Sequence, residues 1–224
     1  MDGLWIWLIC AGVPLLFGLW AQARVKSTFN RYSQVPTRNG LTGAQAAEAV
    51  VRYSELGDVT VRPVAGNLTD HYDPRSRTLN LSESVFKAPT VAALGVAAHE
   101  AGHAIQDARN YAPMRLRQTV LPAAQFGQSL WFLPVLIGLV IGATGLVTIG
   151  LVLFSAVVLF QLVTLPVEFE ASKPALVALD SQGLLAADEV DGARAVPRAA
   201  ALTYVAGFVP SLGQLLYFFL ISRR

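Results

Sequence analysis

The sequence predicts a mostly α-helical membrane protein, with about four transmembrane helices and one small region that mixes helix and strand. The chain is 54% hydrophobic and only 14% charged, whereas ordinary soluble domains are about 25% charged. The charges gather in residues 24–118 and 167–198, and long stretches elsewhere have none. A net charge of +2 is too small to indicate a nucleic-acid partner.

The first apolar segment, residues 1–23, is predicted to form an N-terminal transmembrane helix. Its core, Leu4–Ala21, is free of charge and long enough to cross about 30 Å of hydrocarbon. A cleaved signal peptide is the alternative. We favour an uncleaved helix because no basic residue precedes the core and because Trp5, Trp7 and Trp20 are typical of interfacial anchors.

A transmembrane helical hairpin is predicted for residues 121–166, where no charged residue occurs. The two helices are expected at about Ala123–Ile141 and Leu146–Leu165, with Gly142–Gly145 as the turn. The last segment, residues 199–224, is predicted to be a transmembrane or re-entrant helix, because its apolar run contains two glycines and a proline.

Four spans would place residues 24–120 and 167–198 on the same side of the membrane. Of the 17 lysines and arginines, only Arg223 and Arg224 would then lie on the other side. The positive-inside rule therefore predicts a multi-pass protein of the cell membrane whose charged regions face the cytoplasm.

Residues 24–120 are predicted to form the region that mixes helix and strand. Thr42–Gln45 has the form of a capping box and should begin a helix over about 43–56. Thr90 is the expected N-cap of a longer helix over about 91–109.

Two strands are predicted between these helices. Val59–Val64 alternates between apolar and polar residues, and Pro63 places it at a sheet edge. Thr78–Ser82 alternates in the same way and follows a turn signal at Asp73–Ser76. The edge of Thr78–Ser82 is predicted to pair with an extended peptide.

The longer helix carries the stretch VAAHEAGHAIQ, Val96–Gln106. Residues four apart on a helix differ by about 40° around its axis, so His99 and His103 share a face and can bind one zinc ion. Glu100 points aside from that face and is placed to take a proton from an attacking water. The alternative is a pair of solvated histidines. The residues around them are apolar, however, and burial of two histidines and a glutamate among such residues is unfavourable unless these side chains have a binding partner.

A third ligand has to come from elsewhere in the chain. The single cysteine, Cys10, excludes a site built from two or more cysteines. Glu168 and Glu170 follow the charge-free run directly and begin residues 167–198, predicted to be the helix that carries the third ligand. Spacing alone does not choose between the two glutamates. Other carboxylates after the motif are Asp107, Asp180, Asp188, Glu189 and Asp191.

Three blocks of the sequence together resemble the YugP-type neutral zinc metallopeptidases of bacterial membranes. The blocks are LTDHYDPRSRTLNLSE, VAAHEAGHAIQ and LPVEFEASKPAL, and they lie in the family's order. The resemblance covers about residues 2 to 222. It implies a zincin-like fold for residues 24–120, a gluzincin-like zinc endopeptidase activity, a Zn²⁺ cofactor and a protein or peptide substrate.

The chain is also distantly similar to the heat-shock and CAAX-prenyl membrane proteases. Their third zinc ligand is the first glutamate of a Glu-aromatic-x-Ala-Asp pattern, which reads EFEAS at residues 168–172 here. The resemblance implies Glu168 as the ligand beside His99 and His103, with Glu100 as the general base.

Ser172 departs from that pattern, which has an aspartate at this position. A carboxylate that would orient a ligand histidine is therefore missing or comes from elsewhere, and Asp107 and Asp70 are the substitutes considered. His71, or its neighbour Tyr72, is predicted to donate a hydrogen bond to the oxyanion of the reaction, or else to shape a turn.

Two other functions stay open at this point. One is a non-catalytic membrane scaffold or assembly factor that keeps zinc for stability and has a membrane protein as its partner. The other is an intramembrane protease of the site-2 kind, which Leu179–Gly183 faintly resembles. Only eight apolar residues, Val91–Ala98, precede His99, too few for a span, which disfavours this kind.

Overall fold

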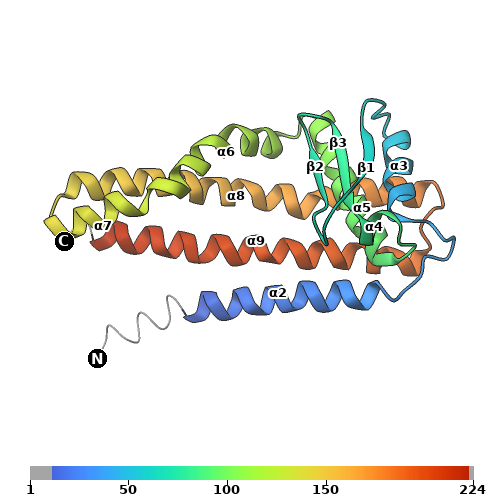
Figure 1. Cartoon of the computed structure of the whole chain (residues 1–224), viewed down its shortest axis with the longest axis horizontal. Helices are drawn as coiled ribbons and strands as arrows, with labels where there is room; N and C mark the ends of the chain where they lie inside the picture. Colours follow the sequence, from blue (N-terminus) through green and yellow to red (C-terminus); the bar gives the residue numbers. More distant parts are fainter. Residues whose placement is uncertain (1–11, 222–224) are drawn as a thin grey trace. The chain divides into compact units, whose positions relative to one another are not determined.

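The computed structural model describes residues 12–221 and contains two compact units. Among these residues, the membrane unit takes in 12–21, 112–166 and 203–221, and the α+β unit takes in 22–111 and 167–202. The chain is mostly helical with one small sheet (Figure 1), which confirms the general fold class. Residues 4–11 of the predicted N-terminal span, Leu4–Ala21, lie outside the described residues, and residues 13–21 belong to the start of α2 (Val13–Tyr32).

The membrane unit is built from long apolar helices. They are α6 (Ala112–Leu130), α7 (Phe132–Ile141), the first part of α8 (Thr144–Ser181) and the last part of α9 (Ala187–Ile221). The described part of α2 (Val13–Tyr32) also begins in this unit. Among the described residues, α8 and α9 are long and apolar enough to cross a membrane, and α6 with α7 adds a third span if this pair, bent by 44°, is one span.

A turn joins α7 to α8 at the residues where the turn of the hairpin was expected. Helix α7 ends at Ile141, and Gly142 caps it in the left-handed conformation at φ 70°. A residue without a Cβ adopts this conformation without strain, so the glycine ends the helix cleanly. Helix α8 then continues past the predicted end at Leu165 to Ser181, and α9 is likewise unbroken at Pro210.

Large apolar side chains cover the outside of the membrane unit. Exposure of such a surface to water is unfavourable, whereas the hydrocarbon of a bilayer solvates it. The apolar side chains are therefore placed as in a protein that faces lipid. Examples with more than half of their surface exposed are Leu133, Val140, Ile141, Val152 and Phe126. Inside the unit, Val135, Val147 and Leu151 form a buried cluster against Trp131.

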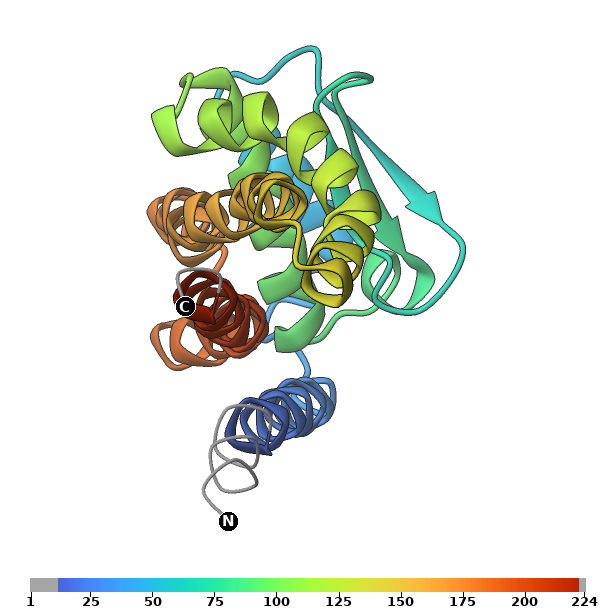
Figure 2. The same ribbon diagram turned by 90° about the vertical axis from the view of Figure 1, so that its left-hand side faces the viewer.

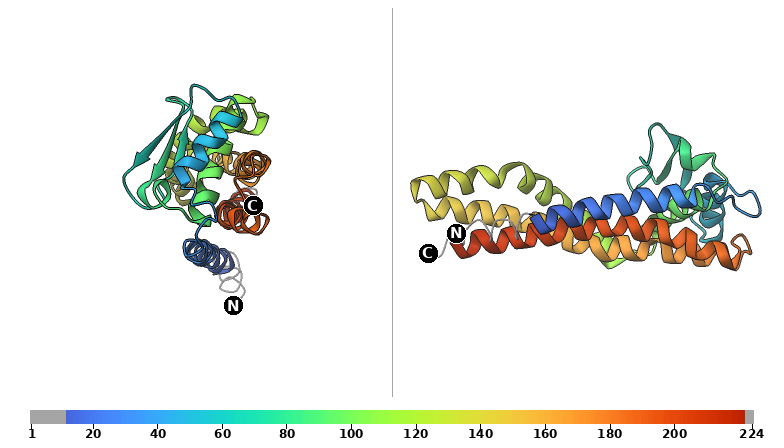
Figure 3. Two further views of the ribbon diagram at one scale, coloured as in Figure 1. Left: turned by 90° about the vertical axis from the view of Figure 1, so that its right-hand side faces the viewer. Right: turned by 90° about the horizontal axis from the view of Figure 1, so that it is seen from below.

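The α+β unit contains a three-stranded sheet with helices on one face (Figures 2 and 3). The strand order is β1-β3-β2, with β1 parallel and β2 antiparallel to β3. Helices α3 and α5 pack on this sheet. The elements are α3 (Gly43–Tyr53), β1 (Thr60–Val64), β2 (His71–Asp73), β3 (Thr78–Ser82), α4 (Glu83–Phe86) and α5 (Val91–Ala108).

Both predicted helix starts are confirmed by their caps. The Gln45 backbone N–H donates to the Thr42 hydroxyl and the Thr42 N–H donates to the Gln45 side chain, which is a complete capping box. The Ala93 N–H donates to Thr90 Oγ1 at the start of α5. The Thr90 cap fixes the residue at which α5 begins, and therefore which residues of α5 lie against the rest of the unit.

The prediction that Thr78–Ser82 offers a free edge is wrong. This strand, β3, is the central one, and both of its edges are paired. The outer strands are β1, which agrees with the edge position expected from Pro63, and β2 at His71–Asp73. Strand β2 was not predicted, because three residues are too few to show an alternating pattern.

Glycines let α5 approach α8 and α9 closely. A Cβ placed on Gly102 would collide with the backbone carbonyl of Ala171 on α8, and one on Gly95 would collide with that of Ala193 on α9. The backbones therefore meet without side chains between them, and this contact brings the His99–His103 face of α5 against α8.

We expect Gly102→Ala to destabilise the protein by about 2–3 kcal/mol, because the added methyl group has to push two helix backbones apart. Thermal unfolding in detergent micelles measures this change. Gly57→Ala is the matched control, since a Cβ on Gly57 meets nothing within 4 Å, and its effect should stay within about 0.5 kcal/mol. Equal stability of the two variants would contradict the close contact.

Candidate metal centre

Three metal-ligating side chains meet where α5 packs on α8. His99 and His103 come from α5 and Glu168 comes from α8, and one ligand atom of each lies within 4.8 Å of the others. Glu168 Oε2 is 3.3 Å from His99 Nε2 and 3.7 Å from His103 Nε2. All three residues are buried. The two nitrogens and the carboxylate thus converge as a zinc site requires.

Glu170, the competing glutamate, lies elsewhere. It is exposed on the outside of α8 and pairs with Lys173 at 3.8 Å. Glu168 and Glu170 are about 200° apart around the helix axis, so only one of them can face α5. The structure brings Glu168 to the histidines.

The Nδ1 atom of each histidine, which faces away from Glu168, contacts a neighbouring side chain. His99 Nδ1 lies 2.9 Å from Ser172 Oγ, and His103 Nδ1 lies 3.0 Å from Gln106 Oε1. The amide of Gln106 donates to the Val167 carbonyl at 2.9 Å, so its oxygen faces His103 and accepts a hydrogen bond from the Nδ1–H group. In the neutral His103 ring the proton therefore lies on Nδ1, which leaves Nε2 free of a proton toward Glu168, as metal ligation needs.

Ser172 therefore contacts His99 from the position where the Glu-aromatic-x-Ala-Asp pattern has an aspartate. Neither predicted substitute has this role among the described residues. Asp70 accepts hydrogen bonds from the Ser82 backbone and hydroxyl, and Asp107 accepts one from the Tyr72 hydroxyl. The contact of Gln106 with His103 was not predicted, although a residue three positions after His103 lies on the same face of the helix and can be expected to reach it.

The electrostatics of the cluster favour a cation. Burial lowers the pKa of His103, but the hydrogen bond that the ring donates to Glu168 and the negative charges of Glu100 and Glu168 outweigh burial, so that this pKa lies above its usual value. A proton is thus drawn to the place where a zinc ion would sit. The donor set, its burial and this negative field all fit zinc.

Glu100 lies next to the cluster on the side of the sheet. It is buried, and its Oε2 accepts a hydrogen bond of 3.0 Å from the Tyr72 backbone N–H on β2. Because this contact uses one carboxylate oxygen, the side chain is held in place while the other oxygen is left for a proton. Glu100 is not itself part of the metal-ligating group.

The side chains of His71 and Tyr72 point to different surroundings. Burial, together with the hydrogen bond and charge of Asp107, raises the pKa of Tyr72 to about 12, so the phenol stays protonated and donates to Asp107. His71 is exposed, with its ring nitrogens 2.8 Å from the Thr69 carbonyl and 3.2 Å from the Asn80 amide. The structure does not bring His71 to the metal-ligating group, and its catalytic role stays a prediction.

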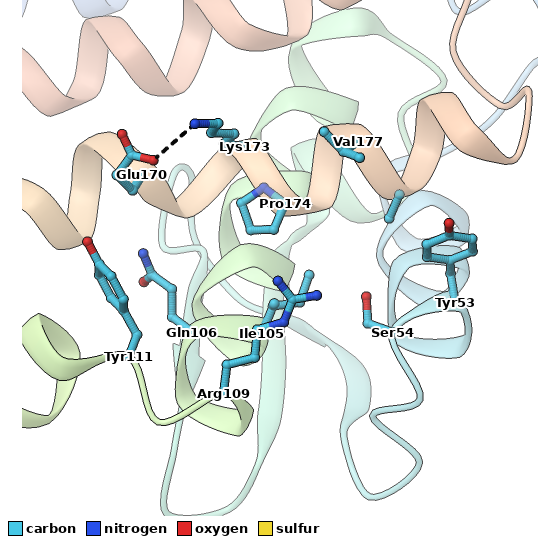
Figure 4. A pocket seen from close by; sticks show the side chains of 11 residues that line it. Tyr53, Ser54, Ile105, Gln106, Arg109, Tyr111, Glu170, Lys173, Pro174 and Val177 are labelled. Carbon is cyan, nitrogen blue, oxygen red and sulfur yellow. Dashed lines mark ion pairs between the residues drawn. The ribbon is translucent and has the colours of Figure 1, made fainter.

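A cavity of about 590 Å³ is lined in part by Gln106, the residue whose side chain contacts His103. Figure 4 shows Gln106 and Tyr111 reaching toward α8, where Lys173 pairs with Glu170. Apolar side chains, among them Ile105 and Pro174, form part of the lining. The volume is within the usual range for ligand sites, about 300–1,000 Å³.

We expect Ser172→Ala to weaken zinc binding about 10-fold to 100-fold, because His99 loses the partner that fixes its orientation. Competition with a fluorescent zinc chelator measures the affinity. Ser181→Ala, at the end of the same helix, is the matched control, because the exposed Ser181 hydroxyl donates to the Val177 carbonyl of its own helix and has no other partner in the described part of the chain. Unchanged zinc affinity in Ser172→Ala would show that this contact has no such role.

The fold and the site together define a class: a helical membrane protein whose candidate metal centre consists of an HExxH helix and a glutamate from a second helix. The chain belongs to the family described as "Putative neutral zinc metallopeptidase", which matches residues 7–223. It is 44% identical over 218 residues to the "Putative membrane protease YugP" of Bacillus subtilis (strain 168), covering 97% of this chain and 96% of that protein. No solved structure gives a significant match. The family predicted from the three sequence blocks is thus confirmed.

Proposed function

We propose that this protein is a membrane zinc endopeptidase of the His-His-Glu type. His99, His103 and Glu168 would hold the zinc ion, which supplies a Lewis acid that polarises water and the scissile carbonyl. The observation that carries the proposal is the buried Glu100, locked by the Tyr72 N–H directly beside this group. The membership of a zinc metallopeptidase family supports it.

In this proposal Glu100 performs the proton transfers. Its carboxylate takes a proton from the attacking water and then delivers that proton to the nitrogen of the leaving amine, while the peptide bond breaks. The Tyr72 N–H keeps the carboxylate in one orientation through both transfers. Ser172 and Gln106 hold the rings of His99 and His103, so that neither histidine can rotate out of place.

The remaining features of the proposal concern the membrane. Residues 24–120 would form a zincin-like region facing the cytoplasm. Residues 1–23 and 121–166 would span the membrane, residues 199–224 would form a transmembrane or re-entrant helix, and residues 167–198 would be the helix that returns Glu168 to the zinc. The substrate is a protein or peptide. Its extended chain reaches the site beside β2, the outer strand nearest Glu100.

Incubation of the purified protein with casein, an unfolded soluble substrate, tests this function. We expect fragments to form with zinc present, and no fragments from His103→Ala. Soluble casein also separates this proposal from the site-2 alternative, which requires a substrate within the bilayer. Intact casein with the zinc-loaded wild type, over a range of pH and detergents, would contradict the proposal.

A further inference from the structure

A second cavity, of about 370 Å³, lies between α8 and α9 in the α+β unit. Its wall contains the basic Lys173, Arg194 and Arg198 and the acidic Glu168 and Glu170. Lys173 pairs with Glu170, and Glu168 faces the two histidines. The two arginines of α9 therefore give this cavity an unbalanced positive charge.

Arg194 and Arg198 form a pair of like charges. They are four residues apart, so they project from one face of α9, and both are exposed. Within residues 12–221, neither guanidinium has a hydrogen bond, an ion pair or a ring contact. Like charges at this spacing destabilise a helix. An anion that bridges the two guanidiniums removes the repulsion and accepts their paired N–H donors.

The cavity lies where two helices change from polar to apolar sequence. On α9, no charged residue follows Arg198 within residues 199–221, and on α8 none precedes Glu168. Phe169, an exposed aromatic residue, also lines the cavity. Aromatic residues and arginines with this placement are typical of the head-group level of a bilayer, where basic pockets between membrane helices bind anionic lipids.

We propose that this cavity binds the phosphate of an anionic phospholipid head group, with Arg194 and Arg198 as the hydrogen-bond donors. Ser172 also lines this cavity, and its hydroxyl contacts His99. The bound head group would therefore lie beside the outer contacts of the candidate metal centre. The proposal concerns lipid binding alone, so it can hold even if the protein does not cleave peptides.

The test uses the full-length protein in nanodiscs of phosphatidylcholine, alone or mixed with phosphatidylglycerol, and native mass spectrometry to count retained lipids. Each basic group contributes a factor of roughly five to such binding, so R194Q/R198Q should retain phosphatidylglycerol about 30-fold more weakly. R62Q/R75Q removes the same charge from exposed positions of the same unit and should bind like the wild type. R194K/R198K keeps the charge and should restore most of the binding. Unfolding temperatures in phosphatidylcholine alone check that every variant is folded.

Equal retention of phosphatidylglycerol by R194Q/R198Q and R62Q/R75Q would overturn the proposal. A second arm titrates inorganic phosphate against the wild type in phosphatidylcholine. Binding of inorganic phosphate as tight as that of the lipid would show that the cavity takes the free anion, and would also overturn the assignment to a lipid. Selective, arginine-dependent retention of phosphatidylglycerol would establish it.

Discussion

Glu100→Gln should keep the zinc ion and lose peptide hydrolysis. Loss of a general base costs about 10²-fold to 10⁴-fold in rate. The amide has the same shape as the carboxylate, and its oxygen can still accept the Tyr72 N–H. It cannot take a proton from water, however. We therefore expect a folded variant with unchanged zinc content and a rate of casein cleavage lower by this factor.

Glu48→Gln is the matched control for that experiment. Glu48 is an exposed glutamate of α3, and its one ion pair within residues 12–221 is a surface contact of 3.8 Å with Arg52. The Glu48→Gln variant should cleave casein at the same rate as the wild type. A Glu100→Gln protein with full activity would contradict the assignment of the base. A wild type that binds zinc but has no activity on any peptide would instead favour the scaffold alternative.

Removal of zinc should abolish activity and also weaken the fold. Two of the proposed ligands come from α5 and one from α8, so the ion would add a cross-link between two helices that also meet at the close contact of Gly102. A ligand at 100 times its Kd stabilises the native state by about 2.7 kcal/mol. We expect 1,10-phenanthroline to stop casein cleavage and lower the unfolding temperature, and added zinc to restore both.

This zinc dependence should also change with pH. Protons compete with zinc for the imidazole nitrogens, and the pKa of His103 lies above its usual value. Zinc retention should therefore be complete above that pKa and decline as the pH falls through it. Full cleavage activity in the chelated protein, shown by metal analysis to lack zinc, would contradict a metal mechanism.

The sequence determined the helix that carries the histidines but not the complete site. His99 and His103 could be paired from local spacing, because helical periodicity alone sets their directions. The choice between Glu168 and Glu170 depends on the rotation of α8 against α5, which is a tertiary property. Only the resemblance to known proteases selected Glu168, and in the structure it is Glu168 that lies beside the two histidines.

The contacts around the ligands were harder to predict. Ser172 was regarded as a lost carboxylate, yet a hydroxyl at that position reaches His99 Nδ1. Strand β2 was missed because it is short and polar, so the hydrogen bond between the Tyr72 N–H and Glu100 could not be expected. Both contacts join residues far apart in the chain, and no local pattern encodes such a distance.

Zinc content, measured side by side in wild type, Glu168→Ala and Glu170→Ala, tests the central claim most directly. The two glutamates are neighbours on one helix, so each variant is a control for the other in charge and position. We predict about one zinc ion per chain in the wild type and in Glu170→Ala, and almost none in Glu168→Ala. Loss of zinc in Glu170→Ala alone, or retention in both variants, would contradict the proposed His-His-Glu centre.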